Sequence, residues 1–263
     1  MVLRLVGHEL VEVEEDTATP PQNRQGTAQD RPAEDKRSFV QRLFTRIAPR
    51  YDWFNRLASC GLDQRWRRTA MTRGMVEPGS RILDVCTGTG DLAILCARRQ
   101  RGQGMVVGID MNRAMLTYAQ QKQRRSGLEV QWFEGDAQAL PFADGSFDRV
   151  MVGFSTRNLS DLMVGLREMV RVLRPGGRLI MLETGLPSNP IVRVGYLVFL
   201  GTAARVIGFI LTGRVWPFSY LARSVKEFLT PAQCVERLQG LKTEVQYVPL
   251  SHGLASLYLA TKQ

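Results

Sequence analysis

Histidine is nearly absent from this chain, because its 263 residues include only two, His8 and His252. Zinc sites and Ser-His-Asp triads depend on histidine side chains, so neither chemistry has enough material here. We therefore expect no metal, and we assign His252 no catalytic role. Any reaction must be carried out by other side chains.

Cysteine is also scarce, and the four cysteines form no CxxC pair. No cleavable signal sequence is recognisable before them, so we expect reduced thiols in a cytoplasmic protein. Cys86 falls in a glycine-rich turn, where we expect it to serve packing. The other three cysteines are Cys60, Cys96 and Cys234.

No apolar run is both long enough and uncharged enough to cross a membrane. Residues 191–213 form the most apolar stretch, but Arg193 and Arg205 lie inside it. A charged residue near the bilayer centre costs roughly 2.5 to 3.5 kcal/mol. We expect instead an apolar helical insertion over residues 187–230, which forms a lid on the acceptor side or lies on a membrane face.

Positive charge dominates most of the chain. Residues 1–37 hold five Lys/Arg against eight Asp/Glu, which leaves 30 against 17, a net charge of +13, for residues 38–263. A basic body can indicate nucleic acid, an anionic membrane surface or solubility alone. Many of the arginines occur in helical contexts, so a solvated face is the expectation for most of them: Arg65, Arg67, Arg68, Arg98, Arg99, Arg124 and Arg125.

The chain divides into a tail and one domain. Glu12 to Arg37 is acidic and has no apolar period, so we expect residues 1–37 to be a disordered acidic tail. Residues 38–76 show helical spacing of apolar residues and predict a helical cover. Beyond them, short apolar strands alternate with helices, which predicts βαβ units and a parallel sheet in a single α/β domain, residues 38–263.

The strongest chemical signal is LDVCTGTGD, residues 83–91. Gly88 and Gly90 allow a tight turn from strand to helix and a close approach of the backbone to a ligand. GTGDLA also matches the dinucleotide fingerprint GxGxxA. A pyrophosphate needs an electropositive helix N-terminus, whereas Asp84 and Asp91 bracket this turn with carboxylates. The sequence therefore favours a cationic ligand without phosphate, such as S-adenosylmethionine.

Two further acids follow the next two strands. Asp110 ends the second strand and is placed to accept both ribose hydroxyls, and Asp136 in FEGDAQALPF can accept from the adenine amino group. Taken singly, Asp91 reads equally well as a helix N-cap and Asp136 as a turn residue. Three acids at three successive strand ends, together with the glycine turn, favour the ligand site.

These features resemble class I S-adenosylmethionine-dependent methyltransferases. Five longer segments are similar, more narrowly, to the menaquinone and ubiquinone biosynthesis C-methyltransferases: FTRIAPRYDWFNRLASCGLDQRWRR, GDAQALPFADGSFDRV, GFSTRNLSD, LREMVRVLRPGGRLIMLE and SYLARSV. The resemblance implies a doubly wound Rossmann-like methyltransferase sheet, S-adenosylmethionine as cofactor, and a prenylated quinol (demethylmenaquinol- or demethylubiquinol-like) methylated on a ring carbon. Separately, the apolar run at residues 191–213 predicts a transient peripheral contact with the inner face of the membrane.

The resemblance assigns roles by position. Arg157, Tyr51 and Asn158 would be catalytic and face the quinol, with Arg157 or the Tyr51 hydroxyl holding a water that assists loss of the phenolic proton. Tyr51 can also be read as part of a helix N-terminus, and Asn158 as the cap of the helix beginning near Ser160. The predicted cofactor-binding residues are Asp84, Gly88, Thr89, Gly90, Asp110, Met111, Asp136, Ala137 and Gly153.

The acceptor half departs from the family pattern. Ser155 and Thr156 follow Phe154, where the family usually has glycine directly after the phenylalanine. One alternative is therefore a methyltransferase of another small hydrophobic phenol or polyketide. A second is an RNA-binding protein that retains the fold, although the aromatic residues do not interleave with arginines on a strand platform. We expect no nucleic-acid partner, and the sequence leaves a monomer and a homodimer open.

Overall fold

The computed structural model describes residues 2–6, 9–13, 30–187, 189–202, 206–207, 209–210 and 216–263. Its main feature is a seven-stranded sheet in the order β5-β4-β3-β6-β7-β9-β8. The strands are β3 (Arg81–Val85), β4 (Met105–Asp110), β5 (Gln131–Glu134), β6 (Phe147–Gly153), β7 (Leu173–Thr184), β8 (Thr243–Leu250) and β9 (Ala255–Lys262).

The first five of these strands are the predicted ones, and they run parallel. The prediction of a wholly parallel sheet is wrong at one edge, because β9 pairs antiparallel with both β7 and β8. The two strands are joined by the short 3-10 turn η3 (Ser251–Gly253), so the chain needs no crossover helix there. The α/β class and the Rossmann-like arrangement are confirmed.

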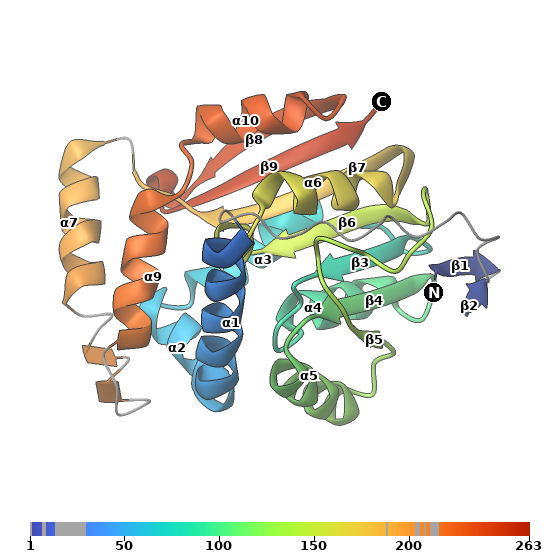
Figure 1. Cartoon of the computed structure of the whole chain (residues 1–263), viewed down its shortest axis with the longest axis horizontal. Coiled ribbons are helices and arrows are strands. Elements are labelled where there is room, and N and C mark those ends of the chain that lie inside the picture. Colours follow the sequence, from blue (N-terminus) through green and yellow to red (C-terminus); the bar gives the residue numbers. More distant parts are fainter. Residues whose placement is uncertain are drawn as a thin grey trace.

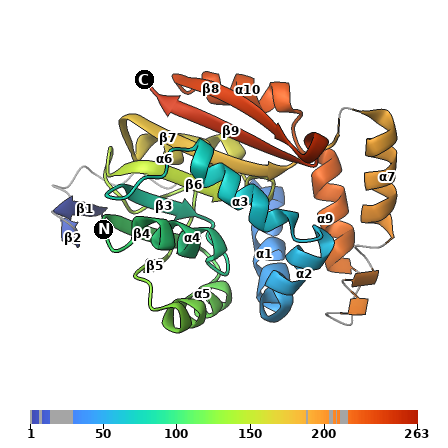
Figure 2. The ribbon, with the colours of Figure 1, turned by 180° about the vertical axis from the view of Figure 1, so that it is seen from behind.

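Helices cover both faces of the sheet (Figures 1 and 2). One face packs against α3 (Leu62–Arg73) and α4 (Asp91–Gln100), and the other against α6 (Leu162–Arg171) and α10 (Pro231–Gln239). Helix α5 (Arg113–Ser126) lies beside β4 and β5. Apolar side chains point to both faces of the central strands, so two cores sandwich the sheet.

A second group of helices gathers where the parallel strands end (Figure 1). They are α1 (Asp30–Ile47), the 3-10 turn η1 (Ala48–Arg50), α2 (Tyr51–Ala58), α7 (Pro190–Gly201) and α9 (Trp216–Glu227). Ligands of open α/β sheets bind at this edge. These helices therefore enclose the expected position of the site.

Helix α1 begins earlier than the sequence indicates. Residues 30–37, assigned to the disordered tail, are helical. They lack an apolar period, but they offer acidic residues and a proline in the first turn and good helix formers after it, which suits a helix start. Near the N-terminus, β1 (Val2–Val6) and β2 (Glu9–Val13) pair antiparallel, and residues 14–29 of the tail lie outside the described part.

The apolar insertion contains α7 and α9. In the described part of the chain, no helix combines the length and the apolar character that a membrane crossing requires. The proposed boundaries of the tail, the cover and the insertion remain predictions.

Candidate active site

The turn from β3 into α4 forms the floor of a cleft. Gly88 and Gly90 have φ of +58° and +78°, a region that favours glycine. A Cβ on Gly90 would lie 2.6 Å from the Trp132 ring, so this glycine is also required by packing. Cys86 has φ of +53°, a region that favours glycine, and it lines the cleft.

Asp84 holds this turn in shape. Its Oδ2 accepts hydrogen bonds from Thr87 Oγ1 at 2.6 Å and from the Ala93 amide at 3.0 Å. Burial raises the pKa of Asp84 to about 7, against the opposing effect of these two donors. Asp84 also lines the cleft, so it serves the geometry of the turn as well as the cleft's polarity.

Asp110 presents a carboxylate at the end of β4. Its two oxygens accept the Gly88 and Asn112 amides, each at 2.8 Å, and burial raises its pKa to about 6. An ionised carboxylate has about four lone-pair sites, so two remain for ligand hydroxyls. These acceptor sites fit the two ribose hydroxyls of S-adenosylmethionine.

The predicted cofactor residues are only partly brought together. Gly90, Asp136 and Ala137 do not line the cleft. Asp136 pairs instead with Arg37 of α1 at 3.0 Å, and Ala137 is buried in the core between the sheet and α6. The predicted residues that do line the cleft are Asp84, Gly88, Thr89, Asp110, Met111 and Gly153.

Helix α1 covers the cleft and is held there by polar contacts. Gln41 donates to the Met111 carbonyl at 3.3 Å, and the Asn112 amide side chain donates to the Gln41 carbonyl and to Thr45 Oγ1. Lys36 donates to the Leu159 carbonyl at 2.7 Å. The sequence predicted a helical cover, but nothing in its pattern identified these polar contacts.

The expectation that Asp91 offers a free negative charge is wrong. Lys122 of α5 pairs with Asp91 at 2.6 Å and with Asp52 of α2 at 2.7 Å, and Asp52 also accepts from Thr89 Oγ1. The pKa of Asp91 is lowered: burial acts to raise it, but Lys122 and nearby arginines outweigh that effect. Asp91 is therefore neither a helix cap nor an uncompensated charge.

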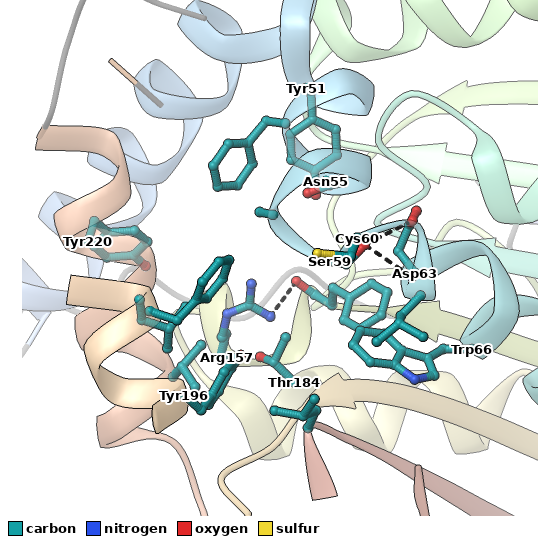
Figure 3. Close-up of a pocket in the computed structure, with 18 of the residues that line it drawn as sticks. Tyr51, Asn55, Ser59, Cys60, Asp63, Trp66, Arg157, Thr184, Tyr196 and Tyr220 are labelled. Carbon is teal, nitrogen blue, oxygen red and sulfur yellow. Dashed lines mark hydrogen bonds between the residues drawn. The ribbon is translucent and has the colours of Figure 1, made fainter. Parts of the chain in front are cut away.

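A second, apolar cavity of about 510 Å³ adjoins the cleft (Figure 3). Its volume falls in the range typical of small-molecule sites. Side chains from five helices and the end of the sheet form its wall, and most are apolar or aromatic. They include Leu43, Phe44, Tyr51, Phe54, Trp66, Phe154, Tyr196, Phe199 and Tyr220.

Arg157 and Asn158 lie in this cavity, on the 3-10 turn η2 (Thr156–Asn158) that follows β6. Arg157 forms a buried ion pair with Glu183, and Asn158 Oδ1 accepts a hydrogen bond from Tyr220 of α9 at 3.2 Å. The interpretation of Asn158 as a helix cap is wrong, because Asp161 caps α6 through the Val164 amide.

Four side chains line both the cleft and the cavity: Phe44, Tyr51, Arg67 and Asn158. Burial raises the pKa of Tyr51 above 10, with smaller opposing effects from Asn55, Arg67 and Arg157. At neutral pH the Tyr51 hydroxyl is therefore a neutral donor. The junction between the two spaces is where a group could pass from a ligand in one to a ligand in the other.

The placement of Arg67 on a solvated face is wrong. It is buried, pairs with Asp63 at 3.0 Å, and its guanidinium lies 5.1 Å from the centre of the Phe154 ring. A signal was available, because Asp63, Trp66, Arg67 and Ala70 share one face at helical spacing. Glu183, Tyr196 and Tyr220 were also missed, since their motifs carried no sign of a site.

The comparisons with known proteins agree with this geometry. Residues 31–262 match the model of the ubiE/COQ5 methyltransferase family. A demethylmenaquinone methyltransferase of Thermus thermophilus is 40% identical over 220 residues, which is 84% of this chain and all of the relative. A ubiquinone/menaquinone biosynthesis C-methyltransferase UbiE of Hahella chejuensis is 35% identical, covering 88% of this chain and 94% of the relative.

Among solved structures, a SAM-dependent methyltransferase from Aquifex aeolicus aligns with a TM-score of 0.57 at 18% identity, covering 75% of this chain and 89% of that one. A likeness at this identity supports the fold alone. The family match and the relatives support the enzyme class and the cofactor.

Proposed function

Because the chain belongs to the ubiE/COQ5 methyltransferase family, we propose that it methylates a ring carbon of a prenylated quinol, using S-adenosylmethionine. The observation that carries the proposal is the pair of adjoining spaces: a polar cleft at the strand ends and an apolar cavity into which Arg157 directs a guanidinium nitrogen. A prenylated naphthoquinol or benzoquinol is apolar except for its two hydroxyls, which suits such a cavity.

S-adenosylmethionine supplies a methyl group activated by its sulfonium. The residues of this chain must do the rest. Asp110 and the amides around Gly88 hold and orient the cofactor, while the aromatic wall of the cavity orients the acceptor ring and excludes water. Tyr51 and Asn158, at the junction, align the two ligands.

The acceptor carbon becomes nucleophilic as the neighbouring hydroxyl loses its proton. Arg157 cannot take that proton, because a guanidinium stays protonated. Its role in the proposal is to stabilise the developing phenolate in an apolar surrounding. A water, for which Arg157 and the Tyr51 hydroxyl are the available donors, carries the proton away.

The direct test is anaerobic incubation of the protein with methyl-labelled S-adenosylmethionine and a chemically reduced, short-chain demethylmenaquinol. We expect label on the ring carbon, identified by mass spectrometry, and none on an acceptor whose hydroxyls are methylated. A demethylubiquinol and a simple phenol of similar size are tested in parallel. Transfer to the phenol alone would replace the quinol by another hydrophobic phenol as acceptor.

We also propose that α7 touches the inner face of the membrane. Its cavity side carries Tyr196 and Phe199. Its other side is apolar too, with Ile191, Val194 and Val198 exposed by 82%, 61% and 59%. A helix at a water-facing surface normally has one polar face, but the one charged side chain of α7, Arg193, donates to the Pro187 carbonyl near the start of the helix. The exposed apolar side of α7 therefore needs a second apolar neighbour. A lipid surface would supply it, and the prenyl tail could pass beside α7 into the cavity.

This contact is tested with serine at Ile191, Val194 and Val198 together. We expect reduced flotation with liposomes and lower turnover of a long-chain quinol in liposomes, while a short-chain quinol in solution is methylated as before. Met75, exposed by 49% at the end of α3, provides a matched control as Met75→Ser. Equal losses on both quinols would mean that α7 is only part of the folded core.

A further inference from the structure

Glu183 is a buried carboxylate at the end of β7, with a relative exposure of 1%. Its Oε2 accepts from Thr156 Oγ1 at 2.7 Å and from the Arg157 amide at 3.4 Å. Its Oε1 accepts from the Thr184 amide at 2.8 Å, from the Thr184 hydroxyl at 3.2 Å and from Arg157 Nη1. Both oxygens are thus occupied by donors from η2 and from β7 itself.

The same contacts fix the Arg157 guanidinium. Nη1 donates to Glu183 and to the Phe154 carbonyl at 2.7 Å. Phe154 has φ of +60°, an uncommon conformation for an aromatic residue, and this turn presents its carbonyl to Arg157. Figure 3 shows the other terminal nitrogen of Arg157 directed into the cavity.

A buried ion pair is a poor source of stability, because desolvating two charges offsets most of their attraction. The position of this ion pair beside an apolar cavity is therefore better explained by a function of the pair than by its contribution to stability. Arg157 without its partner would be an uncompensated cation against an apolar ligand, free to change its rotamer. With Glu183, the charge of Arg157 is balanced and its guanidinium is held in one orientation, with Nη1 occupied.

We propose that Glu183 is a positioning residue for Arg157. Glu183 locks the guanidinium of Arg157 and balances its charge, so that one donor nitrogen of Arg157 meets the acceptor hydroxyl. The inference rests on the proposed function. Glu183 does not touch the acceptor and takes no proton in the reaction, since its oxygens are saturated by five donors. It acts through Arg157 alone.

Several other ionisable groups surround the pair, and the Arg67–Asp63 ion pair of α3 lines the same cavity. Burial raises the pKa of each of the three surrounding tyrosines above 10 and the pKa of the Cys234 thiol to about 11. Lys36 reaches the Arg157 carbonyl from α1, and burial lowers its pKa from 10.5. The tyrosines are Tyr51 on α2, Tyr196 on α7 and Tyr220 on α9.

The test compares Glu183→Gln with wild type on a short-chain quinol over pH 6 to 9. We expect kcat to fall at least tenfold at pH 7 while the Kd of S-adenosylmethionine stays within threefold. We also expect the rise of kcat with pH to move to lower pH by about one unit, because an unbalanced cation lowers the pKa of the bound acceptor hydroxyl. A purely structural role would not move this profile.

Glu168→Gln is the matched control, because Glu168 is paired with Arg171 on α6, away from the cavity. A second arm adds Glu183→Gln to an Arg157→Met variant, which removes both charges and avoids an unpaired one. We expect no further loss of turnover in that background.

The positioning role is overturned if Glu183→Gln leaves the pH profile unchanged, or if it lowers turnover in the Arg157→Met background as much as it does in wild type. In either case, turnover of the quinol by the wild-type protein would leave the proposed function intact. If Glu183→Gln does not fold, the Arg157→Met pair decides the question. Wild-type protein that does not methylate the quinol at all would overturn the proposed function and this inference with it.

Discussion

The cofactor cleft and the acceptor cavity share four side chains but are built from different parts of the chain. The cleft takes most of its polar groups from the ends of β3, β4 and β6, which parallel pairing brings to one edge. The cavity takes most of its wall from two pairs of helices, α1 with α2 and α7 with α9, and the two pairs are more than a hundred residues apart in sequence. The cleft is lined largely by carboxylates and backbone amides, whereas the cavity is largely apolar and aromatic, with two buried ion pairs, Arg67–Asp63 and Arg157–Glu183, at its wall.

This difference separates two kinds of adaptation. The cleft depends on backbone geometry, such as the positive φ at Gly88, and leaves little freedom for substitution. The cavity wall depends on the size and shape of exchangeable apolar side chains. A change of acceptor can therefore occur on the helices while the cleft stays the same.

The largest expected effect lies in the cavity, at Arg157. We expect Arg157→Lys to lower kcat at least thirtyfold, because lysine lacks the planar multi-donor geometry of a guanidinium, and loss of one preorganised donor elsewhere costs about a hundredfold. The Kd of S-adenosylmethionine should stay within threefold and the melting temperature should change little. Steady-state kinetics on a short-chain quinol measures kcat, and calorimetry measures the Kd and the melting temperature.

The Arg157 variant also has an independent check. Wild-type turnover should rise with pH as the quinol ionises, and Arg157→Lys should recover part of its deficit at high pH. A lysine variant with wild-type turnover would mean that Arg157 has no role in the mechanism. The cavity would then be only a gap in the packing of the helices around it.

Much of the cleft could be predicted from the sequence, and most of the cavity could not. Gly88 and Asp110 follow strands, and the ends of parallel strands meet at one edge whatever the remainder of the chain does. Tyr196 and Phe199 reach the cavity only through the packing of α7 against α9, which no local pattern encodes. Arg157 was found through a family motif, but its partner Glu183 read as the end of an ordinary strand.

Two further errors have the same origin. From its residue type and helical context, Arg67 was assigned to a solvated face, and Lys122 was given no role. In the structure Arg67 is buried against Asp63, and Lys122 compensates Asp91 and Asp52. Charge at a sequence position predicts polarity, but its partner is decided by which helices pack together. The electrostatic argument from the sequence predicted the right cofactor, although it left out the positive charge of Lys122 that compensates Asp91.

The next largest effect lies in the cleft, at Asp110. Alanine there removes an acceptor of charge-assisted hydrogen bonds, each worth roughly 1.5 to 3 kcal/mol. We expect the Kd of S-adenosylmethionine to rise at least tenfold by calorimetry, with the acceptor KM little changed. Asp144→Ala, an exposed carboxylate paired with Arg171, is the control. Unchanged affinity, or tighter binding of NAD, would contradict the assignment of the cleft.

A comparable effect should appear with pH alone. Burial raises the pKa of Asp110 to about 6, so the ionised acceptor is present above pH 6 and is lost as the pH falls below it. We expect the affinity for S-adenosylmethionine to fall roughly tenfold between pH 7 and pH 5, in keeping with one protonation. Asp110→Asn should flatten this dependence. If the asparagine variant keeps the full slope, another group in the cleft is responsible.

The smallest effect tests whether the lid helix α9 tunes the cavity through Asn158. Tyr220 donates to Asn158 Oδ1 at 3.2 Å, and Phe39 of α1 packs edge-on against its ring at 5.2 Å. Tyr220→Phe keeps the ring and removes the donor, a net loss of about 1 kcal/mol.

We expect the quinol KM of Tyr220→Phe to rise about threefold, with kcat and cofactor affinity unchanged, because Asn158 positions the acceptor and stabilises no charge. Asn158→Ala should raise KM further, and adding Tyr220→Phe to it should change nothing more, since contacting residues that act as one unit are not additive. Tyr247→Phe on β8 is the control, as its ring stacks on Tyr258 away from the cavity. Additive effects of the two changes would mean that Tyr220 meets the acceptor directly, and that α9 contributes its own contact to the cavity.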